Sequence, residues 1–350
     1  MTGLHRTWFM LMVLFVLLAS QVGAQSVLEP DQPGPYKVGT MTLEFTDSSR
    51  DDRPLQVMLW YPADQSGTSL PHPPDVSGAP YPLIIWSHGF GGAVRDGAAL
   101  ARHLVSRGYV VVGIIHPDVL DDWDWPEVDR PLDDLFVLDE LASSDDERLA
   151  GLINFDQGGI LGFSFGATGA LQVAGARVDL ANFLAWCETT PVEEQGGYCE
   201  ILPAIDQLEQ YQAAHIPLAE DGLWSSTTDP RIRAAMVMSP CAGQEIGARG
   251  LAEVSIPVFI AAGTSDNTCP YLMDGRFMFD QIGRPDSYLL TLEGTGHDGI
   301  FSSDSDLAPF FATALFDTYL KGVTGSDQFL SPEAAEQFNN VTLEVGHTGG

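Results

Sequence analysis

Short apolar runs separated by helix-length segments are the feature that most constrains the fold of this 350-residue chain. Residues 83–87 and 109–115 are almost continuously apolar, as expected of strands that are covered on both faces. The segment between them, 98–107, has its apolar residues on one side of a predicted helix. A strand, a helix and a second strand in this order form a parallel crossover unit. We therefore expect an α/β fold built on a mostly parallel sheet.

The same alternation continues along the chain. Further strands are predicted at 159–161, 233–239, 258–262 and 287–292, and further helices at 131–142, 167–174 and 307–321. Upstream, 42–45 and 55–61 alternate between apolar and polar residues and flank a polar turn, which indicates a β-hairpin. We expect this hairpin to form the antiparallel N-terminal edge of an eight-stranded sheet with helices on both faces.

Residues 182–229 interrupt this alternation and contain a predicted helix at 204–214. We expect this segment to be a lid, or cap, inserted after the helix that follows Ser164 and lying over the carboxyl edge of the sheet. The region 25–350 is long enough for one large α/β domain with a substantial core. We therefore predict a single domain that carries the lid as an insertion.

The first 24 residues have the pattern of a secretory signal peptide. His5 and Arg6 precede an apolar run at 8–18, and small residues at 22–24 provide a cleavage site. The mature chain is predicted to start near Gln25 and to be secreted or periplasmic. Later segments lack the length and apolarity of a membrane span, so stable membrane insertion is not expected.

Four cysteines, Cys187, Cys199, Cys241 and Cys269, all lie in the mature part of the chain. An even number of cysteines in an exported protein indicates disulfides, and four cysteines allow three pairings. We favour Cys187 with Cys199, which would staple a local insertion. Cys241 and Cys269 follow two strand-like segments that would be neighbours in the sheet, so we expect them to form the second bond.

The formal net charge of −32, from 48 acidic and 16 basic residues, argues against binding to nucleic acid or to anionic lipid. Asp121, Asp122 and Asp124 form an acidic run, but they lack the ligand spacing of a calcium-binding loop. The cysteines likewise lack the spacing of a zinc site. We expect no metal and no cofactor.

The pentapeptide Gly162-Phe163-Ser164-Phe165-Gly166 places a serine between two glycines, where a predicted strand meets a predicted helix. A turn of this kind holds its serine in strained backbone geometry, and the flanking glycines allow strand and helix to approach closely. Ser164 is therefore the candidate nucleophile.

Asp266 and His297 each follow a predicted strand directly, as Ser164 does. Because the carboxyl ends of parallel strands meet at one edge of a sheet, we expect the three side chains to lie close together. A serine hydroxyl becomes an effective nucleophile when an imidazole accepts its proton. His297 is therefore the predicted general base, and Asp266 is the acid that orients it.

Other residues compete for the roles of acid and base. Asp286 and Asp298 are alternative acids, but Asp266 is the one that lies a short turn beyond a buried strand. His88 and His116 also lie at strand ends, yet both precede the serine in the chain. We assign these two histidines a structural or pocket-lining role.

An oxyanion needs two preorganised backbone N–H donors. Phe165, directly after Ser164 at the start of a helix, is predicted to supply one donor, and Phe90, in the glycine-rich turn at 88–92, the other. For the side chains of Phe90 and Phe165, like those of Trp86, Trp186 and Trp224, a place in the core is the more usual role.

These motifs and their order resemble the α/β-hydrolase superfamily, whose nucleophile, acid and base follow one another along the chain. The resemblance is carried by Ser87-His88-Gly89-Phe90-Gly91-Gly92, Gly162-Phe163-Ser164-Phe165-Gly166-Ala167, Ala261-Ala262-Gly263-Thr264-Ser265-Asp266 and the segment 130–138. Within the superfamily, the chain is most similar to serine esterases related to platelet-activating-factor acetylhydrolase, to dienelactone-hydrolase-like enzymes and to cutinase-like polyester hydrolases. Dienelactone hydrolases proper use a cysteine where this chain has Ser164.

The resemblance implies a secreted serine hydrolase that cleaves carboxylic esters through an acyl-enzyme, without a cofactor. A small-molecule or lipid-like ester is the expected substrate. Three alternatives keep the same triad: a phospholipase A2 or platelet-activating-factor acetylhydrolase activity on short acyl chains, a polyester hydrolase, and a peptidase. A fourth alternative is a catalytically silent binding protein on a hydrolase scaffold, which predicts no covalent labelling of Ser164.

Overall fold

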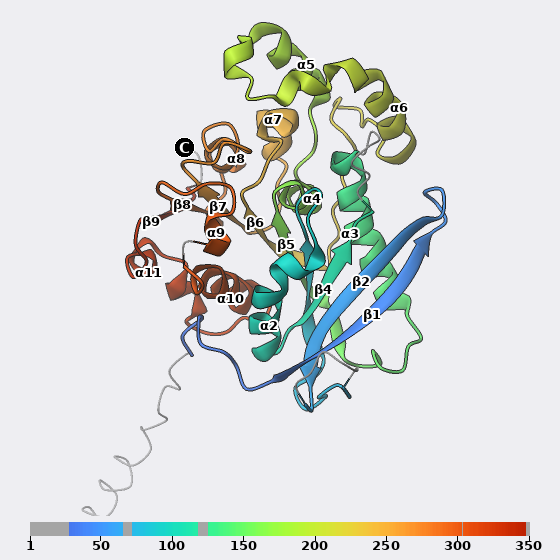
Figure 1. Ribbon diagram of the computed structural model, residues 1–350, viewed down its shortest axis with the longest axis vertical. Helices are drawn as coiled ribbons and strands as arrows, with labels where there is room; N and C mark the ends of the chain where they lie inside the picture. The colour runs from blue at the N-terminus through green and yellow to red at the C-terminus, as the bar shows by residue number, and fades with distance from the viewer. Residues whose placement is uncertain (1–27, 66–71, 118–124, 303, 348–350) are drawn as a thin grey trace, which may run out of the picture.

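The computed structural model describes residues 28–65, 72–117, 125–302 and 304–347 (Figure 1). Two sequence-based predictions lie outside the described residues. These are the signal peptide at 1–24 and the acidic run at 121–124, to which we assigned no metal.

Nine strands form one sheet in the order β1-β2-β4-β3-β5-β6-β7-β8-β9. They are β1 (Lys37–Asp47), β2 (Arg53–Ala63), β3 (Tyr81–Ser87), β4 (Val110–Ile115), β5 (Ile153–Phe163), β6 (Ile232–Met238), β7 (Val258–Gly263), β8 (Ser287–Leu292) and β9 (Val341–Val345). The strands from β3 to β8 pair in parallel, and the β1–β2 hairpin joins β4 in the antiparallel sense. The α/β fold, the mostly parallel sheet and its antiparallel N-terminal edge are thus confirmed.

The prediction of eight strands was wrong, because the C-terminal tail adds β9. This strand pairs antiparallel with β8, and Leu343 lies opposite Leu290. Of its five residues, Leu343 alone is buried. A short edge strand with a single buried side chain leaves little apolar pattern in the sequence, which explains why it was missed.

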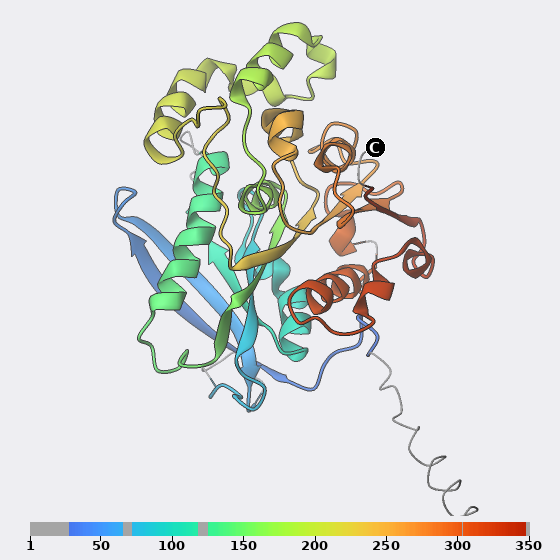
Figure 2. The same ribbon diagram turned by 180° about the vertical axis from the view of Figure 1, so that it is seen from behind.

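Helices pack on both faces of the sheet (Figures 1 and 2). They are η1 (Val94–Gly97), α2 (Ala98–Ser106), α3 (Pro126–Ser143), α4 (Phe165–Val173), α5 (Leu180–Thr189), η2 (Val192–Glu194), η3 (Tyr198–Ala204), α6 (Ile205–His215), α7 (Gly243–Leu251), α8 (Gly275–Ile282), α9 (Gly299–Ser302), α10 (Leu307–Tyr319), η4 (Ser326–Phe329) and α11 (Pro332–Ala335). One hydrophobic core lies under α3 and α4, and the other lies under α2 and α10. Successive residues of β3 alternate between the cores: Ile85 belongs to the first and Trp86 to the second.

Helix α3 begins five residues earlier than the predicted start at Pro131. Pro126 occupies its first turn, a position that suits proline because the N–H there has no acceptor within the helix. Pro131 lies inside the helix instead of starting it.

The segment from α5 to α6 stands beyond α4 and α7, apart from the sheet, in both Figure 1 and Figure 2. The predicted helix at 204–214 is confirmed as α6. A disulfide joins Cys187 of α5 to Cys199 of η3. A second disulfide joins Cys241 and Cys269, which follow the neighbouring strands β6 and β7. Both predicted pairings are therefore confirmed.

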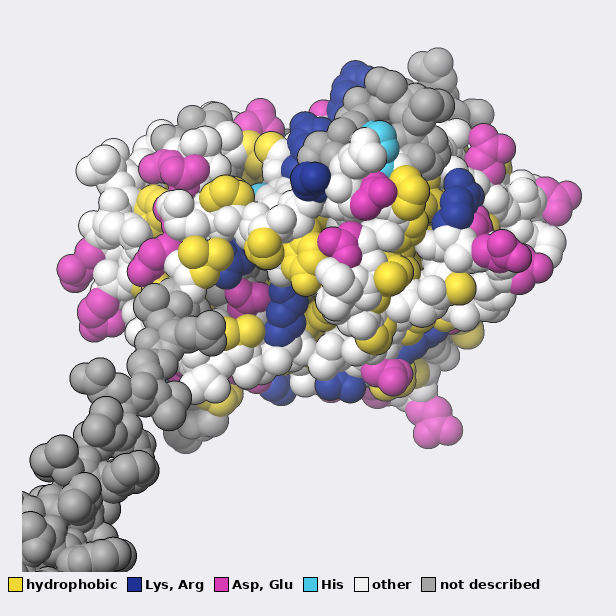
Figure 3. All heavy atoms as spheres, turned by 90° about the horizontal axis from the view of Figure 1, so that it is seen from below, with side chains coloured by type: hydrophobic (Ala, Val, Ile, Leu, Met, Phe, Trp, Pro, Cys, Tyr) yellow, Lys and Arg dark blue, Asp and Glu magenta, His cyan; other side chains and the backbone are white. Residues whose placement is uncertain are grey.

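Charged side chains are interspersed on one face of the molecule. On the face shown in Figure 3, acidic side chains lie among basic and apolar ones. Within the described ranges, no helix combines the length and the apolar composition that crossing a bilayer requires.

Candidate active site

The carboxyl ends of β3 and β5 lie side by side where the strand order reverses. From β3 the chain passes through α2 to β4 on one side, and after α3 it returns to β5 on the other side of β3. Ligand sites in open α/β sheets form at such a switch point. The turn at 88–92 follows β3 here, and Ser164 follows β5.

Ser164 is the single residue between β5 and α4. Its backbone adopts φ 55° and ψ −124°, and its N–H donates to the carbonyl of Met238 on β6 at 3.0 Å. A Cβ on Gly162 would collide with the backbone of Gly166, and a Cβ on Gly166 would collide with the Ser87 carbonyl. Both glycines are therefore required for the close contact of strand, turn and helix that the sequence predicted.

Asp266 lies in the turn after β7, and His297 lies in the turn after β8. His297 Nδ1 lies 2.7 Å from Asp266 Oδ2, while Asp266 Oδ1 accepts the N–H groups of Thr268 at 2.8 Å and Cys269 at 2.9 Å. Burial alone would raise the pKa of Asp266, but these hydrogen bonds, above all the one from His297, hold it below 3.8. The ionised carboxylate fixes the proton of His297 on Nδ1, so Nε2 is the nitrogen that accepts a proton.

The serine and the histidine both lie next to one disulfide. Ser164 Oγ is 3.6 Å from Cys241 Sγ. The sulfur atoms of Cys241 and Cys269 and a ring nitrogen of His297 lie within 4.8 Å of one another. Among the described residues, no hydrogen bond joins Ser164 to His297. Catalytic hydrogen bonds are often unformed in ligand-free sites and tighten when substrate binds.

Cys241, Cys269 and His297 also have ligand atoms close enough together to share a metal ion. Zinc binds cysteine as the thiolate, and both sulfurs are held in the disulfide. This group therefore lacks the donors that a zinc site needs.

The two predicted oxyanion donors belong to turns that contact Ser164. Phe165 is the first residue of α4, so its N–H has no acceptor within the helix. A Cβ on Gly89 would lie 3.2 Å from Ser164 Cβ, which places the turn after β3 against the serine. The rings of Phe90 and Phe165 meet edge to face, with centroids 5.9 Å apart.

A second chain of serine, histidine and aspartate lies beneath the turn at 88–92. Ser87 Oγ is 3.0 Å from His116 Nε2, and His116 Nδ1 is 2.8 Å from Asp133 Oδ2. Burial, together with the charge of Arg130, lowers the pKa of His116 well below 6.5, so this ring is neutral. Ser87 is 0% exposed and therefore inaccessible to a substrate. We call this group the buried relay; no pattern in the sequence predicted it.

A group of buried acids was also not predicted. Asp274 Oδ1 accepts the Gly243 N–H at 2.8 Å, and Asp274 Oδ2 accepts the hydroxyl of Tyr198 from η3. Burial raises the pKa of Asp274 to about 7 against these hydrogen bonds, and the charge of Asp266 adds to the rise. Burial and neighbouring acids also raise the pKa of Glu245 on α7. The residues come from separate elements, so no local motif marks them.

The aromatic residues considered as core divide into two groups. Trp86 and Trp224 are buried, as core residues are, whereas Trp186 is half-buried. Phe90 is 40% exposed, so its ring is available to a ligand. Among the alternative acids, Asp286 forms an ion pair with Arg284 before the start of β8, at the opposite end of that strand from His297.

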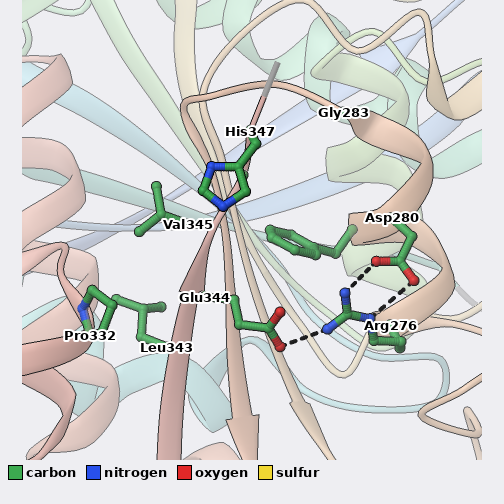
Figure 4. Close-up of a pocket in the computed structure, with 10 residues that line it drawn as sticks. Arg276, Asp280, Gly283, Pro332, Leu343, Glu344, Val345 and His347 are labelled. Atoms are coloured by element: carbon green, nitrogen blue, oxygen red, sulfur yellow. Dashed lines mark hydrogen bonds and ion pairs between the residues drawn. The ribbon is translucent and has the colours of Figure 1, made fainter. Parts of the chain in front are cut away.

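A hollow of about 470 Å³ lies between α8 and β9, and Figure 4 shows the side chains that line it. Arg276 lies in its wall and forms ion pairs with Asp280 and Glu344, so the positive charge of Arg276 is balanced by these carboxylates. None of the residues that line it is a predicted catalytic residue.

Comparisons with known proteins add no family to these observations. Neither a scan against protein-family models nor a search of curated proteins found a match for this chain.

Proposed function

We propose that this protein is a serine hydrolase of the α/β-hydrolase fold that cleaves carboxylic esters through an acyl-enzyme. The observation that carries the proposal is the conformation of Ser164. It sits with positive φ on a strand-to-helix turn, at the sheet edge where Asp266 holds His297. A serine held in this geometry beside an oriented imidazole is the arrangement that nucleophilic acyl transfer requires.

In the proposed reaction, the Ser164 hydroxyl turns from Cys241 Sγ toward His297 Nε2. The imidazole accepts the hydroxyl proton as Oγ attacks the ester carbonyl, and it then protonates the departing alcohol. Asp266 stabilises the imidazolium through the 2.7 Å hydrogen bond to Nδ1. Water attacks the acyl-enzyme in the second half of the reaction, again with His297 as base, and the carboxylic acid leaves.

The negative oxygen of each tetrahedral intermediate would accept the N–H groups of Phe90 and Phe165. Losing one such donor typically costs about 3 kcal/mol of transition-state stabilisation. The Phe165 N–H lies at the positive end of the α4 dipole, which favours an anion at this position.

The segment 182–229 serves as the lid in this proposal. In it, Trp186 and Tyr198 directly precede the disulfide-bonded Cys187 and Cys199, and the centroids of their rings lie 6.3 Å apart. The Tyr198 hydroxyl donates to Asp274, and the charge of Asp266 contributes to the raised pKa of Asp274. The exposed ring of Phe90, which packs against Phe165 next to Ser164, supports a small or lipid-like apolar ester as substrate.

The direct test compares wild type with Ser164→Ala on a short-chain nitrophenyl ester. Turnover should fall by at least about 10³-fold, because the nucleophile is lost. Ser48→Ala, which removes an exposed hydroxyl in the turn between β1 and β2, is the matched control and should keep full activity. Circular dichroism should show that both variants are folded. A Ser164→Ala variant that keeps wild-type turnover contradicts the proposal.

One observation favours the catalytically silent alternative. In this structure the Ser164 hydroxyl contacts Cys241 and does not bond to His297. A binding protein would show no turnover of nitrophenyl esters, short triglycerides, truncated phospholipids, polyesters or peptides. Measuring all five substrates therefore separates this alternative from the hydrolase and ranks the ester classes.

A further inference from the structure

Two hydrogen bonds set the orientation of the peptide group between Gly89 and Phe90. The carbonyl of Gly89 accepts the Gly92 N–H at 2.9 Å, and it lies 2.8 Å from His88 Nδ1. A trans peptide is planar, so the N–H of Phe90 points opposite to the Gly89 carbonyl. Fixing the carbonyl therefore fixes the direction of the Phe90 N–H.

The ring of His88 is itself held in place. Its Nε2 accepts the backbone N–H of His116 at 3.4 Å, and the two rings meet edge to face with centroids 5.2 Å apart. The His88 carbonyl accepts Arg130 Nη1 at 2.7 Å. The partner of Nε2 is a donor, and the partner of Nδ1 is a carbonyl acceptor. These two partners fit the neutral tautomer of His88 that carries its proton on Nδ1. His88 Nδ1 is then a donor to Gly89.

The buried relay anchors His116 on its other side. Asp133 pairs with Arg53 at 2.9 Å and with Arg50 at 2.6 Å. Burial would raise the pKa of Asp133, but the hydrogen bond from His116 and the charge of Arg53 lower it strongly. Ionised Asp133 therefore accepts His116 Nδ1–H, and His116 Nε2 accepts the hydroxyl of Ser87. Both ring nitrogens are engaged, which fixes His116 beneath His88.

We propose that His88 is a positioning residue of the oxyanion hole. Its Nδ1–H holds the Gly89 carbonyl so that the Phe90 N–H faces the oxygen of the substrate. The buried relay supports His88 from below through the His116 backbone. This role rests on the proposed function, since it takes Phe90 as an oxyanion donor.

The test compares His88→Leu with His88→Asn. Asparagine places an amide N–H near the position of Nδ1, whereas leucine fills the space without a donor. For a nitrophenyl ester, kcat of His88→Leu should fall about 10- to 100-fold with KM within about twofold, because the donor is misdirected in the transition state only. His88→Asn should keep kcat within about threefold of wild type.

A second substrate distinguishes a loss of oxyanion stabilisation from a general loss of active-site structure. Sulfur accepts hydrogen bonds weakly. Wild type should therefore prefer an ester to the matching thionoester, and His88→Leu should lose much of that preference. Gly92→Ala is a second variant that perturbs the Gly89–Phe90 peptide, and it removes no buried side chain. Its Cβ would lie 2.9 Å from the Gly89 carbonyl, so it should also lower kcat while keeping the thermal unfolding temperature near that of wild type.

Crystal structures of wild type and His88→Leu complete the test. The Gly89–Phe90 peptide should rotate in the variant. An unchanged peptide with unchanged kcat overturns the role of His88, and so does an equal loss of kcat in the Leu and Asn variants. If wild type hydrolyses no ester, the proposed function fails, and the orientation of the peptide in the two structures still decides whether His88 holds it.

Discussion

At the scale of single residues, half of the non-glycine residues with positive φ lie around the proposed nucleophile. Of the six non-glycine residues with positive φ in the described chain, Ser164, Ser239 and Ala242 lie at or just beyond the ends of β5 and β6. Such conformations cost roughly 1–3 kcal/mol each and persist only where the surrounding structure enforces them. Ser239 also holds the His297 carbonyl through a 2.6 Å hydrogen bond. The strain therefore coincides with the groups that the mechanism uses.

From the raised pKa of Asp274, we expect the stability of the protein to depend on pH. Its pKa is raised from 3.8 to about 7 in the folded protein, chiefly by burial. Between these two pH values, the folded state keeps the Asp274 proton and the unfolded state releases it. The stability that comes from protonated Asp274 is therefore fully present below about pH 4 and is lost as the pH rises to about 7. Asp274→Asn removes the linkage. From pH 4.5 to pH 8, the variant should gain roughly 1–4 kcal/mol in unfolding free energy relative to wild type.

Urea unfolding at the two pH values measures this difference. Asp156→Asn, at an exposed position, is the control and should show the same pH dependence as wild type. A constant difference between Asp274→Asn and wild type at both pH values contradicts the raised pKa.

At the scale of elements, the Cys241–Cys269 disulfide links the proposed nucleophile to the proposed acid. Cys241 Sγ contacts Ser164, and the Cys269 N–H donates to Asp266. Replacing both cysteines by serine should lower stability by about 2–4 kcal/mol. It should also lower kcat about 10-fold or more, because small displacements of catalytic groups are costly. Steady-state kinetics on a small ester, together with thermal unfolding, measures both effects.

The Cys187–Cys199 disulfide provides the matched control. It closes a loop within the segment from α5 to η3 and touches neither Ser164 nor Asp266. Its double serine variant should lose a similar amount of stability and keep kcat on a small ester. Equal kcat in the two double variants would show that the Cys241–Cys269 bond has no positioning role.

The sequence predicted those parts of the fold that depend on local patterns. Buried strands carry continuous apolar runs, and the positions of Ser164, Asp266 and His297 follow from the strand ends. The buried relay was missed because Ser87 ends β3, His116 follows β4 and Asp133 lies on α3, so the three residues meet only after folding. The contact of Tyr198 with Asp274 was missed for the same reason. β9 was missed because only one of its side chains is buried.

At the scale of the whole molecule, one sheet with a core on each face fixes the candidate site at its carboxyl edge. The turns after β3, β5, β7 and β8 all lie at this edge, so residues distant in sequence meet at one place. The helices from α5 to α6 stand beyond that edge (Figure 1). Under the proposed function, the rigid sheet would position the catalytic groups, and the segment from α5 to α6 would set the substrate specificity.

The central claim is that Ser164 is a nucleophile activated by His297. Labelling the folded protein with a fluorophosphonate, followed by peptide mass spectrometry, tests it without knowledge of the substrate. We expect one covalent adduct, on Ser164, formed rapidly by wild type and at least about 10²-fold more slowly by His297→Ala. No adduct on Ser164, or the same labelling rate in His297→Ala, would show that Ser164 is not a nucleophile activated by His297.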